Sequence, residues 1–178
     1  MIIALAGRRI DAAGAKVAHF PVENVETVEQ RIRSLFEEHK PQALVCSAAN
    51  GADLLALAVA CELGIYREIM LPFPPDVFRE LSVTDRPGNW GWRFDRVITD
   101  EGRQQITCLN TPAKGEAAYI VANQAILDRA ASLGCEKNQA VWAVIVWNAA
   151  SRGGQDVTLS FRDAAQTAGM RIIEVPTI

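Results

Sequence analysis

Short apolar runs alternate along this 178-residue chain with segments of helical periodicity. The runs cover residues 2–6, 43–47, 67–71, 141–147 and 171–175, with a less regular candidate at 104–109. Apolar side chains in these runs mostly follow one another without a polar residue between them, which is typical of strands buried on both faces. The pattern predicts an α/β fold: a three-layer, Rossmann-like parallel sheet with helices on both faces.

The segments between the runs predict helices that cover such a sheet. We expect helices over residues 24–39, 52–63, from Thr111 to about Leu133, and over 155–168. Residues 52–63 are apolar nearly all round, which predicts a helix that is buried on more than one side. Thr111 is the expected N-cap of the third helix, with Pro112 in its first turn.

Residues 72–103 interrupt this alternation. The segment is rich in Gly, Pro, Trp and Arg and contains enough helical pattern for one or two turns. A long segment with little pattern is usually a functional lid or a linker, and its aromatic content favours a lid that packs on the sheet. We therefore predict a single domain over residues 1–178 with a lid-like insertion around 72–103.

The overall composition argues against several classes of protein. A net charge of -3 gives no general attraction to nucleic acid or to anionic membranes. No apolar run approaches the ~18 residues of a membrane span, and the short run before Arg8 does not fit a signal peptide. Four scattered cysteines without a CxxC pair, and only two histidines, predict neither a disulfide framework nor a metal site. We expect a cytoplasmic protein.

Three loops follow predicted strands and carry residues suited to an anion. The candidates are Gly7, Arg8 and Arg9 in the first loop, Ser47, Gly51 and Asp53 in the second, and Asn148, Ser151, Arg152, Gly153 and Gly154 in the third. Arginines bind phosphate or carboxylate, and glycines at a helix start bring free N–H groups close to a ligand. Taken alone, the first loop also fits a polar turn exposed to water, and the third a flexible connection between strand and helix. Because ligands of parallel sheets bind beyond the carboxyl ends of the strands, the three together favour a phosphate-bearing ligand.

Several side chains have a structural and a ligand-binding interpretation. Asp53 suits a helix cap, a bond that holds its own loop, or a contact to a ribose hydroxyl. Trp90 suits either packing of the lid or stacking on a nucleobase. Tyr119 and Asn123 lie one helical turn apart, so that they either line one pocket or divide between core and surface.

The second loop and the helix after it, SAANGADLLALAVACELG, resemble the Ser-x-x-x-Gly-x-Asp loop of the SLOG superfamily. This superfamily includes the Lonely Guy phosphoribohydrolases, the Rossmann domain of DprA and the YpsA-like proteins. The stretch VWNAASRGGQDVTLSFRDAAQTAG resembles its second glycine-rich loop, and the opening strand with GRRID is also similar. The resemblance implies a nucleotide or nucleotide-derived ligand, held by Ser47, Gly51 and Asp53 and by Ser151, Gly153 and Gly154.

One departure from the Lonely Guy pattern bears on catalysis. Those enzymes carry two glutamates soon after the glycine-rich loop, and these act on an N-glycosidic bond. In this chain Leu159 and Ser160 occupy the matching positions. Asp156 is the nearest carboxylate, but it comes one turn early, where a favourable charge in the first turn of the helix is its simpler role.

These observations favour a binding module or sensor for a nucleotide-like ligand, with no further cofactor required. The alternative is an enzyme that cleaves a nucleotide N-glycosidic bond, with Asp53, Asp95 or Asp156 as acid or base. Binding of single-stranded DNA in the manner of DprA is a third hypothesis, against which the acidic balance and the missing lysine-rich stripe count. The oligomeric state is open. The superfamily often forms homodimers, and the apolar helix at 52–63 gives some reason to expect one.

Overall fold

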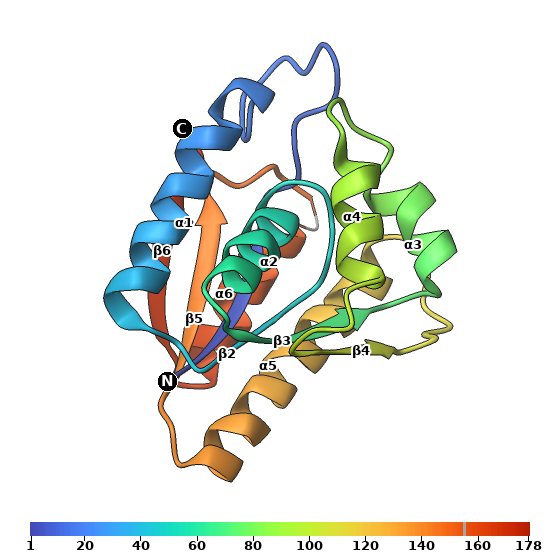
Figure 1. Cartoon of the computed structure of the whole chain (residues 1–178). Helices are drawn as coiled ribbons and strands as arrows, with labels where there is room; N and C mark the ends of the chain where they lie inside the picture. The colour runs from blue at the N-terminus through green and yellow to red at the C-terminus, as the bar shows by residue number, and fades with distance from the viewer. Residues whose placement is uncertain (155) are drawn as a thin grey trace.

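The computed structural model describes residues 1–154 and 156–178, and its strands form one parallel sheet. The strands in this described part are β1 (Ile2–Gly7), β2 (Ala43–Cys46), β3 (Tyr66–Leu71), β4 (Gln104–Cys108), β5 (Val141–Trp147) and β6 (Arg171–Pro176). They lie in the order β4-β3-β2-β1-β5-β6, and every neighbouring pair is parallel. The predicted α/β fold class is confirmed (Figure 1).

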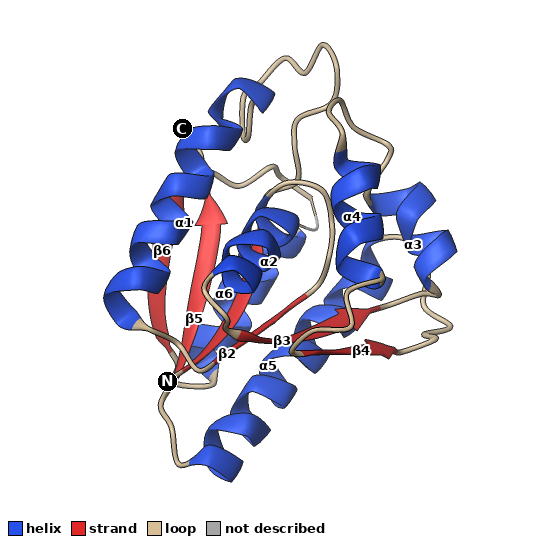
Figure 2. Ribbon diagram, in the orientation of Figure 1, coloured by secondary structure: helices blue, strands red, loops and turns tan. Residues whose placement is uncertain are grey.

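Helices cover both faces of this sheet (Figure 2). The α-helices of the described chain are α1 (Val25–His39, preceded by the 3-10 turn Val22–Asn24), α2 (Ala52–Glu62), α3 (Pro75–Ser82), α4 (Trp90–Ile98), α5 (Glu116–Lys137) and α6 (Val157–Thr167). None of them combines the length and the hydropathy that a bilayer-spanning segment needs.

The core divides into two clusters because successive side chains of a strand point to opposite faces. Ile3 and Leu5 of β1 join the cluster that contains the apolar faces of α1, α2, α3 and α4. Ile2 and Ala4 join the other cluster, beneath α5 and α6. Both faces of β1 are therefore fully buried, which explains its unbroken apolar sequence.

Helix α2 is buried inside one chain. Eight of its eleven residues are buried, and it packs against α1 and α4 as well as against β1 and β3. Its apolar surface is thus covered without a second copy of the chain. This removes the residue-based reason to expect a homodimer, because that reason was an apolar helix face in need of a cover.

The segment 72–103 is more regular than the sequence predicts. It contains the two helices α3 and α4 instead of one or two helical turns. Two contacts join α3 to α4. Phe78 and Phe94 stack with their ring centroids 6.1 Å apart, and Arg79 forms a bidentate ion pair with Asp95 at 2.8 and 2.9 Å. Each helix is short, with few buried side chains, which is why its periodicity is hard to recognise among the flanking Gly and Pro.

One of the predicted helix starts also needs correction. Helix α5 begins at Glu116 with Gly115 at its N-cap, and the expected cap Thr111 instead accepts a hydrogen bond from Ala113 N in the preceding loop. The predicted start of the last helix at residue 155 lies outside the described residues. Helix α6 begins at Val157, with Asp156 as its N-cap.

Candidate functional site

The strand order reverses beside β1, whose neighbours are β2 on one side and β5 on the other. In open α/β sheets, ligands bind outside the carboxyl ends of the strands at such a switch point. A cavity of about 240 Å³ lies there, and the loops after β1, β2 and β5 line it together with α5. We call it the switch-point cavity. The fold therefore brings the three predicted loops to one site.

Seven of the twelve predicted residues line this cavity: Gly7, Arg8, Arg9, Ser47, Asp53, Arg152 and Gly153. The other five, which do not line it, are Gly51, Trp90, Asn148, Ser151 and Gly154. The predicted pair Tyr119 and Asn123 on α5 lines it as well.

A larger hollow of about 900 Å³ lies at the opposite edge of the sheet. Three of its charged residues are already paired, since Arg129 donates to both carboxylate oxygens of Glu68 at 2.6 and 2.8 Å and also to Glu136. None of the three predicted loops reaches it. The smaller cavity at the carboxyl ends of the strands is the better candidate for a ligand site.

Two glycines allow the first two loops to meet. At Gly7, a Cβ atom would lie 2.5 Å from the Cβ of Ala52 and 2.6 Å from the carbonyl oxygen of Val146. At Gly51, where φ is +90°, a Cβ atom would lie 2.7 Å from the carbonyl oxygen of Arg8. The start of α2 therefore sits directly against the end of β1 only because both positions lack a side chain.

Asn50 joins the first two loops to the end of α3, a role that the sequence analysis missed. Its side-chain oxygen accepts from Ile10 N at 3.1 Å. Its side-chain amide donates to Ser82 O at 2.8 Å and to Asp85 at 3.0 Å. The side chain is fully buried, so each bond replaces one that water would otherwise supply. An Asn-Gly pair between a strand and a helix was the available signal, but its partners are distant in sequence.

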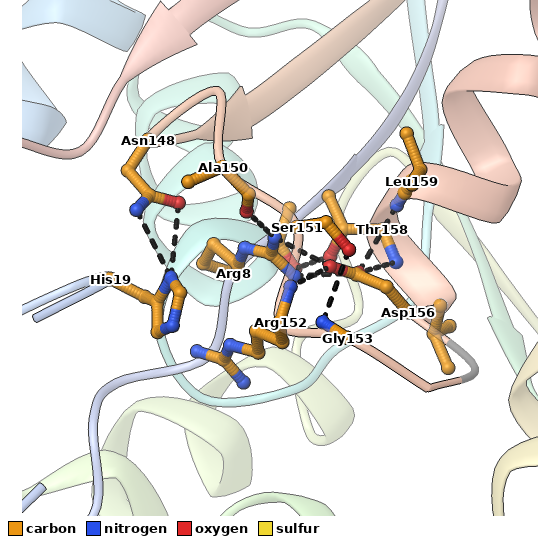
Figure 3. A network of polar contacts seen from close by, with 12 residues as sticks. Arg8, His19, Asn148, Ala150, Ser151, Arg152, Gly153, Asp156, Thr158 and Leu159 are labelled. Carbon is orange, nitrogen blue, oxygen red and sulfur yellow. Dashed lines mark hydrogen bonds and ion pairs between the residues drawn. The ribbon is translucent and has the colours of Figure 1, made fainter. Parts of the chain in front are cut away.

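Arg8 is buried in an ion pair instead of projecting into solvent. Only 2% of it is exposed, and its guanidinium donates to the two carboxylate oxygens of Asp156 at 2.6 and 2.7 Å. It also donates to Ala150 O at 2.5 Å. Arg8 thus holds the third loop against the first, 148 residues away along the chain, as Figure 3 shows.

Asp156 is the N-cap of α6 as well as the partner of Arg8. Its carboxylate accepts from Thr158 N and Leu159 N at 3.1 and 3.2 Å and from Arg152 N at 2.8 Å. Burial raises the pKa of Asp156, but the hydrogen bonds from Arg8 and from the backbone N–H groups of Arg152 and Leu159 outweigh burial and hold that pKa well below its usual range. The carboxyl group is therefore ionised at neutral pH and unsuited to act as a general acid.

The third loop satisfies two of its own backbone N–H groups. Arg152 N donates to Asp156, and Gly153 N donates to Ser151 Oγ at 3.1 Å. The sequence predicts that this loop presents free N–H groups to a phosphate, and in this conformation Asp156 and Ser151 accept from them instead. Asn148 points elsewhere and contacts the His19 ring at 3.0 Å. The sequence pattern identified the loop but not its internal bonds.

Two cationic side chains at the cavity remain partly exposed. Arg9 pairs with Asp85 at 2.9 Å, and Arg152 lies 3.6 Å from Asp11. Both arginine side chains are about one-third exposed, so these pairs are weakly stabilising and can exchange for a ligand anion. Burial and the positive charge of Arg8 lower the pKa of Arg152, and an arginine remains charged at neutral pH.

Asp53 is the carboxyl group in the cavity that titrates near neutrality. Burial raises its pKa to about 7, opposed by a hydrogen bond from Ala49 N and by the charge of Arg9. The bond from Ala49 N measures 3.2 Å, so Asp53 holds its own loop, whereas Gly51 is the N-cap of α2. A carboxyl group of this kind either donates or accepts a hydrogen bond, depending on pH.

Helix α5 supplies the polar wall opposite the loops. Tyr119 Oη lies 2.7 Å from Ser82 Oγ, and the Tyr119 ring makes an edge-on contact with Phe73. Asn123 donates to Val157 O at 2.9 Å, which fixes the distance between α5 and the start of α6.

Trp90 does not take part in this site. It is 3% exposed, packs in the core cluster beneath α4, and donates through Nε1 to Pro87 O at 2.9 Å. A buried indole cannot stack on a nucleobase, so the packing interpretation of this tryptophan is the correct one.

Among the described residues, no group of three or more His, Cys, Asp and Glu side chains is placed to hold a metal ion.

The fold and the switch-point cavity define an α/β protein of the doubly wound, Rossmann-like class. No protein-family model and no curated protein matches the sequence. Among solved structures, the chain is similar to the DNA processing protein A (DprA) from Streptococcus pneumoniae, with 13% identity, a TM-score of 0.42, and coverage of 94% of this chain and 61% of DprA. It is also similar to the molybdenum cofactor binding protein from Rippkaea orientalis, with 13% identity, a TM-score of 0.38, and coverage of 96% and 87%. The chain thus spans about three-fifths of the DprA chain, and both likenesses concern the fold alone.

Proposed function

We propose that this protein binds a nucleotide or nucleotide-derived ligand in the switch-point cavity and acts as a sensor or binding module. The observation that carries the proposal is that the cationic side chains of Arg9 and Arg152 line the same cavity as Ser47 and Asp53. Arginines suit a phosphate group, and short polar side chains suit the hydroxyls of a sugar. The resemblance of the second and third loops to those of the SLOG superfamily supports the same class of ligand.

The size of the cavity favours a small ligand. At about 240 Å³ it lies below the ~300–1,000 Å³ of pockets that enclose drug-sized molecules. A mononucleotide, or the phosphoribosyl part of a larger nucleotide, fits this volume better than a dinucleotide does.

Ligand-induced stabilisation tests the proposal. The protein is heated with a panel of nucleoside monophosphates, diphosphates and cyclic nucleotides at millimolar concentration, and a true ligand raises the melting temperature through the term RT ln(1 + [L]/Kd). Arg9→Gln and Arg152→Gln should reduce the shift. Arg103→Gln is the matched control, since Arg103 is exposed at the opposite edge of the sheet. An unchanged melting temperature across the whole panel would refute the proposal.

Hydrolysis of an N-glycosidic bond is the second candidate, and Asp53 is the observation in its favour. A carboxyl group with a pKa of about 7 in the cavity suits general acid–base work near neutral pH. The other two predicted acids are less suited to be the general acid. Asp95 pairs with Arg79 and does not line the cavity. Asp156 is ionised and forms an ion pair with Arg8. Chromatographic detection of released base would support this candidate, and release that persists in Asp53→Asn would exclude Asp53 as the acid.

A further inference from the structure

The Asp156 carboxylate occupies a complete set of anion donors. One of its oxygens accepts from Arg8 Nη1, Thr158 N and Leu159 N, and the other accepts from Arg8 Nη2 and Arg152 N. An arginine fork and the first N–H groups of a helix are the donors that commonly bind a phosphate. In this protein the chain's own carboxylate fills that position (Figure 3).

A carboxylate does not use every donor that surrounds it. Arg8 is 2% exposed and lines the switch-point cavity, yet its Nε has no hydrogen-bond acceptor among the described residues. Leaving a charged donor buried and unpaired is unfavourable. A phosphate monoester carries three terminal oxygens and more negative charge than a carboxylate, which suits a buried guanidinium that still has an unused donor.

The surroundings of Asp156 favour an exchange of anions. The Asp156 carboxylate accepts a hydrogen bond from Arg152 N, in the loop segment 149–154. All six residues of this segment are exposed. A displaced carboxylate therefore has water close by. The incoming phosphate also gains the nearby charge of Arg152, which lowers the electrostatic cost of replacing one anion with a more highly charged one.

We propose that Asp156 is an internal competitor for the phosphate of the ligand: it occupies the anion position between Arg8 and the start of α6, and a phosphate monoester binds there by displacing it. This regulation rests on the proposed function, because it concerns the same cavity. The affinity of the protein for its ligand then depends on the fraction of time for which Asp156 is dissociated from Arg8.

Removing the competing charge tests the idea. Asp156→Asn keeps an N-cap oxygen for α6 but takes away the carboxylate. If the anion position is open less than about a tenth of the time, the apparent Kd should fall about tenfold or more, because it equals the intrinsic Kd divided by the open fraction. Titration calorimetry with inorganic phosphate and with adenosine 5′-monophosphate measures this change. Asp163→Asn, on an exposed part of α6, controls for the change in net charge.

The outcomes separate this proposal from the proposed function. Equal nucleotide affinity in Asp156→Asn and Asp163→Asn would overturn the competition and leave nucleotide binding intact. Tight phosphate binding by Asp156→Asn, with no nucleotide bound by the wild type, would support the competition and count against the proposed function. Binding of neither probe by either protein would overturn both.

A second measurement needs only the wild-type protein, in case Asp156→Asn does not fold. In isotope-labelled protein, the carboxyl carbon of Asp156 should change its NMR shift as phosphate is added, together with the amides of Arg152 and Thr158 that donate to it. The carboxyl carbon of Asp163 should not respond. An Asp156 carboxyl resonance that stays in place at the highest soluble phosphate concentration would overturn the proposal.

Discussion

Replacing Gly51 with alanine should destabilise the fold by about 2–6 kcal/mol, because this position forbids a side chain in two ways. Its φ of +90° lies in a region where a non-glycine residue costs about 1–3 kcal/mol. The added Cβ would also lie 2.7 Å from Arg8 O and 3.0 Å from Ile10 N. Relief of such a clash needs a backbone shift, which costs roughly 1–3 kcal/mol more.

Urea denaturation followed by circular dichroism measures the change, with the m-value required to stay constant so that the midpoint reports stability. Gly14→Ala is the matched control: Gly14 has a φ of +74° and no heavy atom within 4 Å of the added Cβ. It should cost only about 1–2 kcal/mol, the penalty of the left-handed conformation alone. Equal losses in Gly51→Ala and Gly14→Ala would refute the close approach of the first two loops.

Three further perturbations test other contacts of the site. The folded state keeps the proton of Asp53 up to a pKa of about 7 while the unfolded chain releases it near 3.8, so stability should fall as pH rises between these values. Asp53→Asn should remove this dependence and be more stable than the wild type at pH 8, by up to about 4 kcal/mol. Wild-type denaturation curves with the same midpoint at pH 5 and pH 8 would contradict this prediction. Arg8→Met should cost about 3–5 kcal/mol by leaving the buried carboxylate of Asp156 without its cation, and Asp156→Leu in the same chain should restore much of the loss. Tyr119→Phe should cost about 1 kcal/mol through the lost bond to Ser82, and a melting temperature equal to that of the wild type would show that this bond does not form.

The sheet was predictable because a parallel strand that is buried on both faces has an unbroken run of apolar residues. The run at 141–147 is apolar throughout and forms β5, which is flanked by two strands and covered on both faces. The segment 72–103 was not predictable in the same way. Its two helices bury only a few side chains each, such as Phe78 and Phe94, and flanking Gly and Pro residues mask that short periodicity.

The loops of the site were predictable from the sequence, whereas their internal bonds were not. Strand ends indicate where ligand-binding loops lie, and Arg9 and Arg152 of two such loops line the cavity. Arg8 has the same charge and the neighbouring position, yet it is buried against Asp156. Nothing local distinguishes Arg8 from Arg9, because the partner of Arg8 comes from a loop 148 residues away.

A crystal structure of the protein with a bound nucleoside monophosphate tests the central claim most directly. We expect the phosphate in the switch-point cavity, within hydrogen-bond distance of Arg9 or Arg152, with Asp156 withdrawn from Arg8. A nucleotide bound at the opposite edge of the sheet, with the three loops unoccupied, would contradict the account.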